Sequence, residues 1–226
     1  MNADEPIRLV AASHSRRVTA VDLVRESLRS AILRGDLPGD TRLVQTEIAA
    51  QLDVSTTPVR EAMRDLASEG LITLDSHKIG TVRKTDWEEM EEIVEIRRSV
   101  EKMALRRAIA NISNRELDMA RALAEQLDGE EDIGTWVQKN RDFHCIFHHA
   151  TGTYRLANVL ESLESAGGVF VAQAQRIHPE IRQRAVQDHY ALLEAFNAND
   201  VEAAFEIQYR HVNLPLEAEQ MGGEPD

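Results

Sequence analysis

The chain has 226 residues, of which 42% are apolar, and its formal net charge is −13. This length suggests one or two domains with a proper hydrophobic core. The sequence contains neither an apolar run of about 18 residues nor a signal-peptide pattern, so we expect no contact with a membrane. The single cysteine, Cys145, excludes an intrachain disulfide and agrees with a reducing cytoplasm.

The acidic charge lies in the second part of the chain. Residues 1–85 contain 12 basic and 12 acidic side chains, whereas residues 86–226 contain 14 and 27 and so carry the whole net charge. An acidic surface is repelled by nucleic-acid phosphates, but a neutral one can bind DNA if its arginines are well placed. The N-terminal part is therefore the candidate DNA-binding part.

Two short helices are predicted in this part. The segment 41–52 has apolar residues at helical spacing. Asp53 occupies the turn that follows, because aspartate tolerates the left-handed backbone that a tight corner needs. The next helix begins after Ser55, a good N-cap, carries Pro58 in its first turn and ends at Gly70, a left-handed stop.

The second of these helices has the two faces of a DNA recognition helix. Val59, Met63 and Leu66 recur at helical spacing and predict a buried face. The opposite face is polar and basic, which suits the major groove, where arginine bonds guanine O6 and N7 in bidentate fashion. The DNA contacts predicted from this helix are Ser55, Thr56, Thr57, Arg60 and Arg64. The alternative is an ordinary amphipathic helix with solvated arginines.

A β-hairpin is predicted directly after the recognition helix. Residues 71–74 and 79–82 are rich in apolar and β-branched side chains and flank a polar turn over 75–78. Helix, turn, helix and hairpin together form an α+β winged helix-turn-helix. Lys78 and Gly80, in the hairpin, complete the predicted DNA-binding set.

The pattern after residue 85 is wholly helical. Thr85 to Glu88 and Ser113 to Glu116 are capping boxes, and the later breaks fall at polar, glycine or proline residues. The helices are expected at 85–109, 113–127, 134–150, 153–175, 179–197 and 200–219. Six helices with short connections indicate an all-α antiparallel bundle.

Three histidines in different helices of this bundle form a candidate metal site. Asn140 and His144 are four residues apart and share one helix face, while His189 and His211 lie on later helices among apolar neighbours. Three imidazoles and an amide oxygen can bind one divalent metal. The alternative is that these histidines are ordinary buried or surface polar groups.

A second metal arrangement competes with this one. His144 and His148 form an H-x-x-x-H pair on a single helix. Asp142 would be the acidic ligand, but two residues turn a helix by about 200° and aim Asp142 away from His144.

Sequence motifs in both halves match those of one protein family. In the N-terminal half they are Leu33 to Gly39, Glu47 to Ala49 and Pro58 to Ala62. In the C-terminal half they are Arg97 to Glu101, Asn140 to His144, His189, and Asp200 to His211. Through them the chain resembles bacterial regulators of the GntR family, in the FCD subfamily that includes the fatty-acid-responsive regulator.

The resemblance implies the role of several residues. It implies DNA contacts at the start of the recognition helix, although Thr56 stands where many family members have arginine. It implies a metal site at Asn140, His144, His189 and His211, with Zn²⁺ as the ion and Ni²⁺ or Mn²⁺ as alternatives. It also implies that Arg97 faces the cavity and binds a small organic acid. The alternative for Arg97 is a salt bridge with Glu101, one turn later.

We therefore expect a cytoplasmic, homodimeric, metabolite-responsive repressor, associated with the nucleoid when bound to DNA, and not an enzyme. Two winged helices would read a palindromic operator, and the effector would shift the population of dimer geometries. The expected parts are a flexible N-terminus (1–17), a DNA-binding domain (18–84), a ligand, metal and dimerisation domain (85–219) and a tail (220–226). The alternatives are a metal sensor, and a helical metalloenzyme, which would need a glutamate base near His144.

Overall fold

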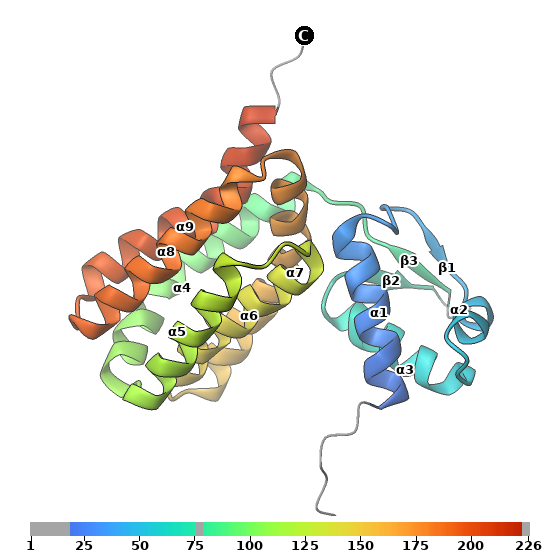
Figure 1. Ribbon diagram of the computed structural model, residues 1–226, viewed down its shortest axis with the longest axis horizontal. Coiled ribbons are helices and arrows are strands. Elements are labelled where there is room, and N and C mark those ends of the chain that lie inside the picture. The colour runs from blue at the N-terminus through green and yellow to red at the C-terminus, as the bar shows by residue number, and fades with distance from the viewer. Residues whose placement is uncertain (1–18, 76–78, 223–226) are drawn as a thin grey trace, which may run out of the picture.

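The computed structural model describes residues 19–75 and 79–222 of the chain. In chain order its elements are α1 (Ala20–Arg34), β1 (Arg42–Leu43), α2 (Gln45–Gln51), α3 (Thr56–Ser68), β2 (Ile72–Leu74), β3 (Gly80–Val82), α4 (Trp87–Asn111), α5 (Asn114–Asp128), α6 (Ile133–Ala150), α7 (Tyr154–Ile177), α8 (Glu180–Asn197) and α9 (Val201–Gly222). They form two units side by side, an N-terminal unit from α1 to β3 and a C-terminal unit from α4 to α9 (Figure 1). Three predictions lie outside the described residues: the flexible N-terminus (1–17), the DNA contact of Lys78 and the end of the tail.

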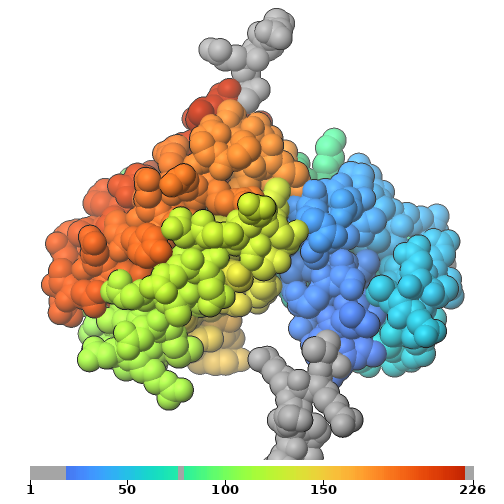
Figure 2. Space-filling view, viewed as in Figure 1, coloured from blue at the N-terminus to red at the C-terminus, as the bar shows by residue number. Residues whose placement is uncertain are grey.

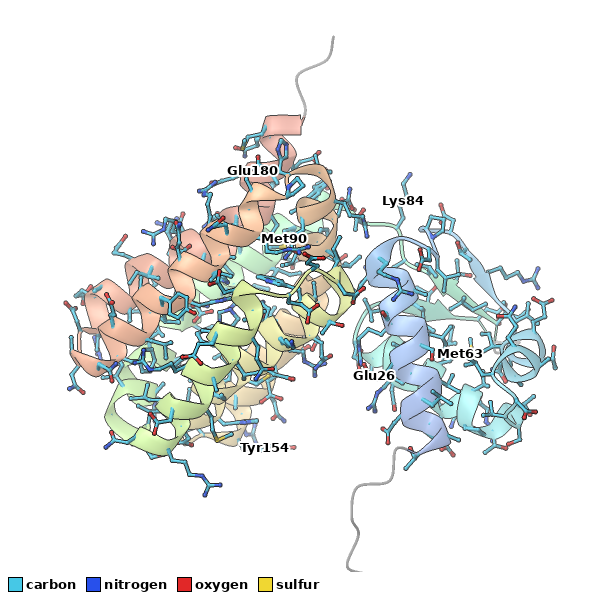
Figure 3. All side chains as sticks on the ribbon, viewed as in Figure 1. Glu26, Met63, Lys84, Met90, Tyr154 and Glu180 are labelled. Atoms are coloured by element: carbon cyan, nitrogen blue, oxygen red, sulfur yellow. The ribbon has the colours of Figure 1, made fainter. Side chains whose placement is uncertain are left out.

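The N-terminal unit is a winged helix-turn-helix, as predicted. Its three strands are antiparallel in the order β1-β3-β2, so that Thr81 of the central strand pairs with Arg42 on one side and Thr73 on the other. The helix α3 packs against β2 of this small sheet, and α1 packs against α3. Met63 of α3 points into the core they enclose and is fully buried (Figure 3).

The expected helix over 41–52 is wrong at its start. Arg42 and Leu43 form β1, and the helix α2 begins only at Gln45. The cause lies about 40 residues away, because β3 supplies the hydrogen bonds that hold β1 extended, including Val82 N–H donating to the Thr41 carbonyl over 2.9 Å. The predicted left-handed corners are confirmed, with φ of +51° at Asp53 and +76° at Gly70.

The C-terminal unit is the predicted all-α bundle. The capping box at Ser113 is confirmed, since its hydroxyl accepts from Glu116 N–H and the Glu116 carboxylate accepts from Ser113 N–H. The capping box at Thr85 is wrong: Asp86 is the N-cap of α4, and the Thr85 hydroxyl instead donates to Gln173 on α7 over 2.6 Å. The tertiary contact with α7 takes up the Thr85 hydroxyl, and the local cap moves one residue along to Asp86, which accepts from Glu88 N–H.

Buried aromatic and aliphatic side chains hold the bundle together. The helices α6 and α7, α8 and α9, and α4 and α9 lie against one another (Figure 1). Trp136 and Phe143 on α6 are at most 1% exposed, and Met90 on α4 points inward against Phe170 (Figure 3). Across residues 19–75 and 79–222, we find no helix with the length and apolar content needed to cross a membrane.

The two units meet where α1 packs against α6 and α7, and Figure 2 shows them as two lobes in contact. The approach is close at Gly134, where an added Cβ would lie 2.8 Å from the Ser30 hydroxyl. The Arg176 guanidinium on α7 donates to the Leu33 carbonyl at the end of α1. Lys84 stands out to solvent from the segment that joins the units (Figure 3). The C-terminal bundle is therefore in direct contact with the helix that supports α3.

Candidate functional site

The helix α3 presents its predicted DNA-binding face to solvent. Ser55 is the N-cap residue and is exposed together with Thr56 and Thr57, and Arg64 is exposed two turns after Thr57. Ser55 makes no side-chain hydrogen bond to the helix within the described part of the chain, so its hydroxyl stays available for a phosphate or a base. Arg60 is half-buried between the two faces. This arrangement fits a helix that inserts its N-terminal end into the major groove.

The opposite face of α3 is fully buried. Val59, Ala62, Met63 and Leu66 are each 0% exposed, as the helical spacing predicts. The C-terminal end of the helix is fixed by Glu69, which accepts from the buried guanidinium of Arg29 on α1 over 3.2 Å. The buried face and this ion pair together hold α3 in one orientation.

Gly80 has a packing role in the structure. It is buried at the start of β3, and an added Cβ would lie only 2.5 Å from the Met63 methyl. Glycine therefore lets the wing lie directly on the recognition helix. A contact between Gly80 and DNA stays a prediction.

Three imidazoles converge inside the C-terminal unit. His144 comes from α6, His189 from α8 and His211 from α9, and one ring nitrogen of each lies within 4.8 Å of the others. His144 Nε2 and His211 Nε2 are 3.1 Å apart. The three side chains are 2%, 1% and 9% exposed, which excludes ordinary surface histidines.

Burial keeps these imidazoles neutral. Desolvation lowers the pKa of His144 and His189 well below the usual value, and lowers the pKa of His211 to about 4. His211 lowers the pKa of His144 and His189 further, and His144 lowers that of His189. The neutral imidazole is the form that binds a metal ion, so the group is ready to accept one without losing protons first.

Asn140 lies four residues before His144, on the same face of α6. It is 4% exposed, and its amide nitrogen donates to Glu164 on α7 over 3.2 Å. Among the described residues nothing donates to Asn140 Oδ1 or bonds either nitrogen of His189, although all three atoms are buried. Burial without a partner is costly for such atoms, and a bound cation would satisfy the oxygen and one of the nitrogens. The residues present therefore fit a divalent metal.

His148 and Asp142 lie apart from this group. The His148 ring centre is 6.4 Å from that of His144, and His148 is not one of the three converging imidazoles. Asp142 is exposed and accepts from Gln138 over 2.9 Å, in agreement with the expected direction of its side chain.

Arg97 is paired with two glutamates. Its Nε donates to Glu101 and its Nη1 to Glu164, each over 2.8 Å, and all three side chains are buried. The salt bridge with Glu101, which the sequence left as an alternative, is thus present. Within the described residues, Arg97 Nη2 is buried without an acceptor. Its contact with an effector stays a prediction.

Sequence reasoning missed two carboxylates beside the imidazoles. Glu164 holds Asn140, and Asp188 lies 3.8 Å from His211 Nδ1 while it accepts from Arg210. A signal for Glu164 existed, because an acid follows Leu160 by four residues on the buried stripe of α7. A charged residue in an apolar stripe rarely stays buried without partners, and so marks a polar site.

A winged helix joined to a helical bundle with a buried histidine cluster defines a class of ligand-responsive DNA-binding proteins. The family model described as "Bacterial regulatory proteins, gntR family" matches residues 21–82, and the FCD domain model matches residues 92–214. The chain belongs to the GntR family of transcription regulators, with an FCD effector-binding domain. It is a regulator rather than an enzyme.

Individual relatives agree with this assignment. The "Probable D-xylose utilization operon transcriptional repressor" of Paenarthrobacter nicotinovorans is 31% identical over 92% of each chain. The "HTH-type transcriptional regulator McbR" of Escherichia coli is 28% identical over 79% of this chain and 83% of its own length. A solved structure of McbR/YncC from E. coli superposes with a TM-score of 0.74 at 25% identity, over 91% of this chain and 99% of that one.

Proposed function

We propose that the chain is a cytoplasmic, homodimeric repressor whose FCD domain binds one divalent metal and a small carboxylate effector. The observation that carries the metal proposal is the convergence of His144, His189 and His211 in a buried site with unsatisfied polar atoms. Nitrogen ligands from three imidazoles favour Zn²⁺, with Ni²⁺ or Mn²⁺ as alternatives. Asn140 supplies the oxygen ligand.

In this proposal residues 18–84 form the DNA-binding domain and residues 85–219 bind ligand and partner. Ser55, Thr56, Thr57, Arg60 and Arg64 contact the operator, and Lys78 reaches it from the wing. A symmetric dimer places two recognition helices on a palindromic site. The similar protein from Paenarthrobacter is described as a probable operon repressor, which supports repression rather than activation of transcription.

A cavity between the two units offers a route from the metal site to the DNA. Glu69 and Leu71, at the end of the recognition helix, line this cavity of about 30 Å³ together with Asn140 and Glu164 of the metal site. A ligand that moves α6 or α7 therefore changes the packing directly behind α3. Such a ligand shifts DNA affinity by no more than its differential affinity for the two arrangements.

The size of the cavity beside His144 favours a second candidate function. This cavity, which His148 and Gln208 also line, measures about 10 Å³ and has room for at most one water molecule. An organic acid enters only if the bundle opens, whereas a metal ion needs no such change. In the second candidate function, the metal itself is the effector.

One experiment tests both candidates. The purified protein is stripped with chelator, and binding to its operator is measured by gel shift with Zn²⁺ alone, with carboxylates alone and with both. A response only to both supports the metal-and-carboxylate regulator, and a full response to Zn²⁺ alone supports the metal sensor. Metal analysis that finds no ion in the untreated protein, with no Zn²⁺ response after stripping, overturns both.

A further inference from the structure

The Asn140 amide is held in one orientation by Glu164. Asn140 Nδ2 lies 3.2 Å from Glu164 Oε1, and the two side chains are 4% and 7% exposed. An ionised carboxylate only accepts hydrogen bonds, whereas an amide donates from nitrogen and accepts at oxygen. A flipped amide would bring two oxygens together at this distance, so the nitrogen must face Glu164.

This orientation leaves the amide oxygen for the metal. Asn140 Oδ1 is buried and, among the described residues, has no donor, while His144 lies one turn further along the same face of α6. We propose that Glu164 is a positioning residue of the metal centre, which turns the Asn140 amide so that its oxygen and not its NH₂ group is offered to the ion. This inference rests on the metal site of the proposed function.

Glu164 can hold the amide because it is itself fixed. Arg97 Nη1 donates to Glu164 Oε2 over 2.8 Å, so each carboxylate oxygen has its own donor. Arg97 cannot turn freely either, since its Nε donates to Glu101. The buried side chains of Glu101, Arg97, Glu164 and Asn140 form one chain of hydrogen bonds that ends at the Asn140 amide nitrogen.

Glu164 acts through Asn140 rather than as a ligand. The group of side chains whose ligand atoms converge contains three imidazoles and, in the part of the chain that the structure describes, no carboxylate. Groups that orient a metal ligand without touching the metal typically change its affinity by about 10- to 100-fold. We therefore expect Glu164→Gln to weaken Zn²⁺ binding by about tenfold or more, because glutamine tolerates either orientation of the amide.

The chain offers a matched control at Glu101. This glutamate binds the same guanidinium as Glu164 but makes no hydrogen bond to Asn140 in the described structure. Glu101→Gln removes one negative charge beside Arg97 but keeps an oxygen that accepts from Arg97 Nε, and it leaves the direct contact between Glu164 and Asn140 in place. The Zn²⁺ dissociation constant of Glu101→Gln should therefore rise less than that of Glu164→Gln, because only Glu164 contacts Asn140 directly.

The sharpest test exchanges the amide and the carboxylate between positions 140 and 164. Asn140→Asp alone places two carboxylates at hydrogen-bond distance, and their repulsion opposes the benefit of a charged ligand. Adding Glu164→Gln restores a donor facing an acceptor, keeps the cavity charge and puts the carboxylate on the metal. The double variant should bind Zn²⁺ more tightly than the wild type and more tightly than either single variant.

The experiment measures Zn²⁺ dissociation constants by competition with a chromophoric chelator, and visible spectra after Co²⁺ loading, on the full-length chain. Melting curves in excess chelator identify any variant that is unfolded. If a single variant is unfolded, the Zn²⁺ dissociation constant of the double variant tests the inference. Equal constants for the wild type and Glu164→Gln, or a double variant that binds more weakly than Glu164→Gln, overturn this inference alone. A wild-type protein that binds neither ion overturns the proposed metal site and this inference with it.

Discussion

His144 Nε2 and His211 Nε2 lie 3.1 Å apart, although 67 residues separate them in the chain. Two buried neutral imidazole nitrogens at this distance either form an N–H···N hydrogen bond or bind a common cation. Burial lowers the pKa of both, and the charge on Arg97 lowers both further, although Glu164 opposes the shift at His211; neither ring takes up a second proton near neutral pH. Both imidazoles are therefore neutral, which is the form that binds a metal ion.

Metal binding should stabilise the folded chain through the three converging histidines. At a free metal concentration of about 100 times the dissociation constant, mass action adds about 2.7 kcal/mol to the free energy of unfolding. For a chain of this length that raises the melting temperature by about 5–10 °C. His189→Ala and His211→Ala should abolish the shift that Zn²⁺ produces in chelator-treated protein.

His148→Ala is the matched control, because it removes a buried imidazole from the same cavity but not from the converging group. It should keep the shift. If His148→Ala loses the shift while His189→Ala and His211→Ala keep it, the site is the single-helix pair with His144.

The metal-free protein should lose stability as the pH falls below about 6.5. Burial lowers the pKa of His211 to about 4 and that of His148 to about 3, whereas an unfolded histidine titrates near 6.5. Between these values the unfolded chain binds more protons, so acid favours unfolding. Each such histidine should cost about 2 kcal/mol at pH 5 relative to pH 7.5.

Urea unfolding at pH 7.5, 6.5 and 5 in chelator measures this loss. Carboxylates also titrate toward the acid end, so the wild type is compared with His148→Gln, which removes one titrating group. The variant should lose less stability between pH 7.5 and pH 5. An identical loss in both proteins would mean that His148 is protonated equally easily when folded and unfolded.

Local sequence patterns correctly predicted the elements whose conformation depends on residues close to them in the sequence. Helical spacing identified the buried face of α3 at Val59, Met63 and Leu66, and residue type identified the left-handed corners at Asp53 and Gly70. The pattern failed where a distant segment decides the conformation. β1 is extended only because β3 pairs with it.

The candidate site shows the same division. His144, His189 and His211 could be selected from the sequence because each is a polar residue within an apolar helix face. Their carboxylate neighbours could not be placed, because the contact of Glu164 with Asn140 depends on how α6 and α7 pack. Helix spacing identifies which residues point inward, but not which of them meet.

Gly80→Ala should destabilise the winged helix without a direct effect on DNA contacts. The added methyl would lie 2.5 Å from the end of Met63, so that flexible side chain must move within a closed core. Overpacking of this kind typically costs about 1–3 kcal/mol. Thermal melting measures the loss, and operator affinity is compared at a temperature where both proteins are folded.

The companion variant Met63→Leu shortens the side chain that the new methyl meets, and the double variant should recover part of the lost stability. A Gly80→Ala protein with unchanged melting but weaker operator binding would instead show that Gly80 lies against the DNA.

Arg60→Ala should weaken operator binding while the protein stays folded. Arg60 lies half-buried beside the exposed Thr56 and Thr57, and its buried Nε has no hydrogen-bond partner in the described part of the chain. One lost bidentate contact to guanine costs about 1–3 kcal/mol per half-site. In a symmetric dimer the loss doubles, which corresponds to about 30-fold or more in affinity.

A gel-shift titration against the native operator and a scrambled duplex measures the effect, which should be confined to the native site. Arg107→Ala is the control, because it removes an exposed arginine from α4 with the same change in charge. It should leave both affinities unchanged. If Arg60→Ala and Arg107→Ala bind the native operator equally well, Arg60 does not read a base, and the contact must be sought at Ser55, Thr56 or Arg64.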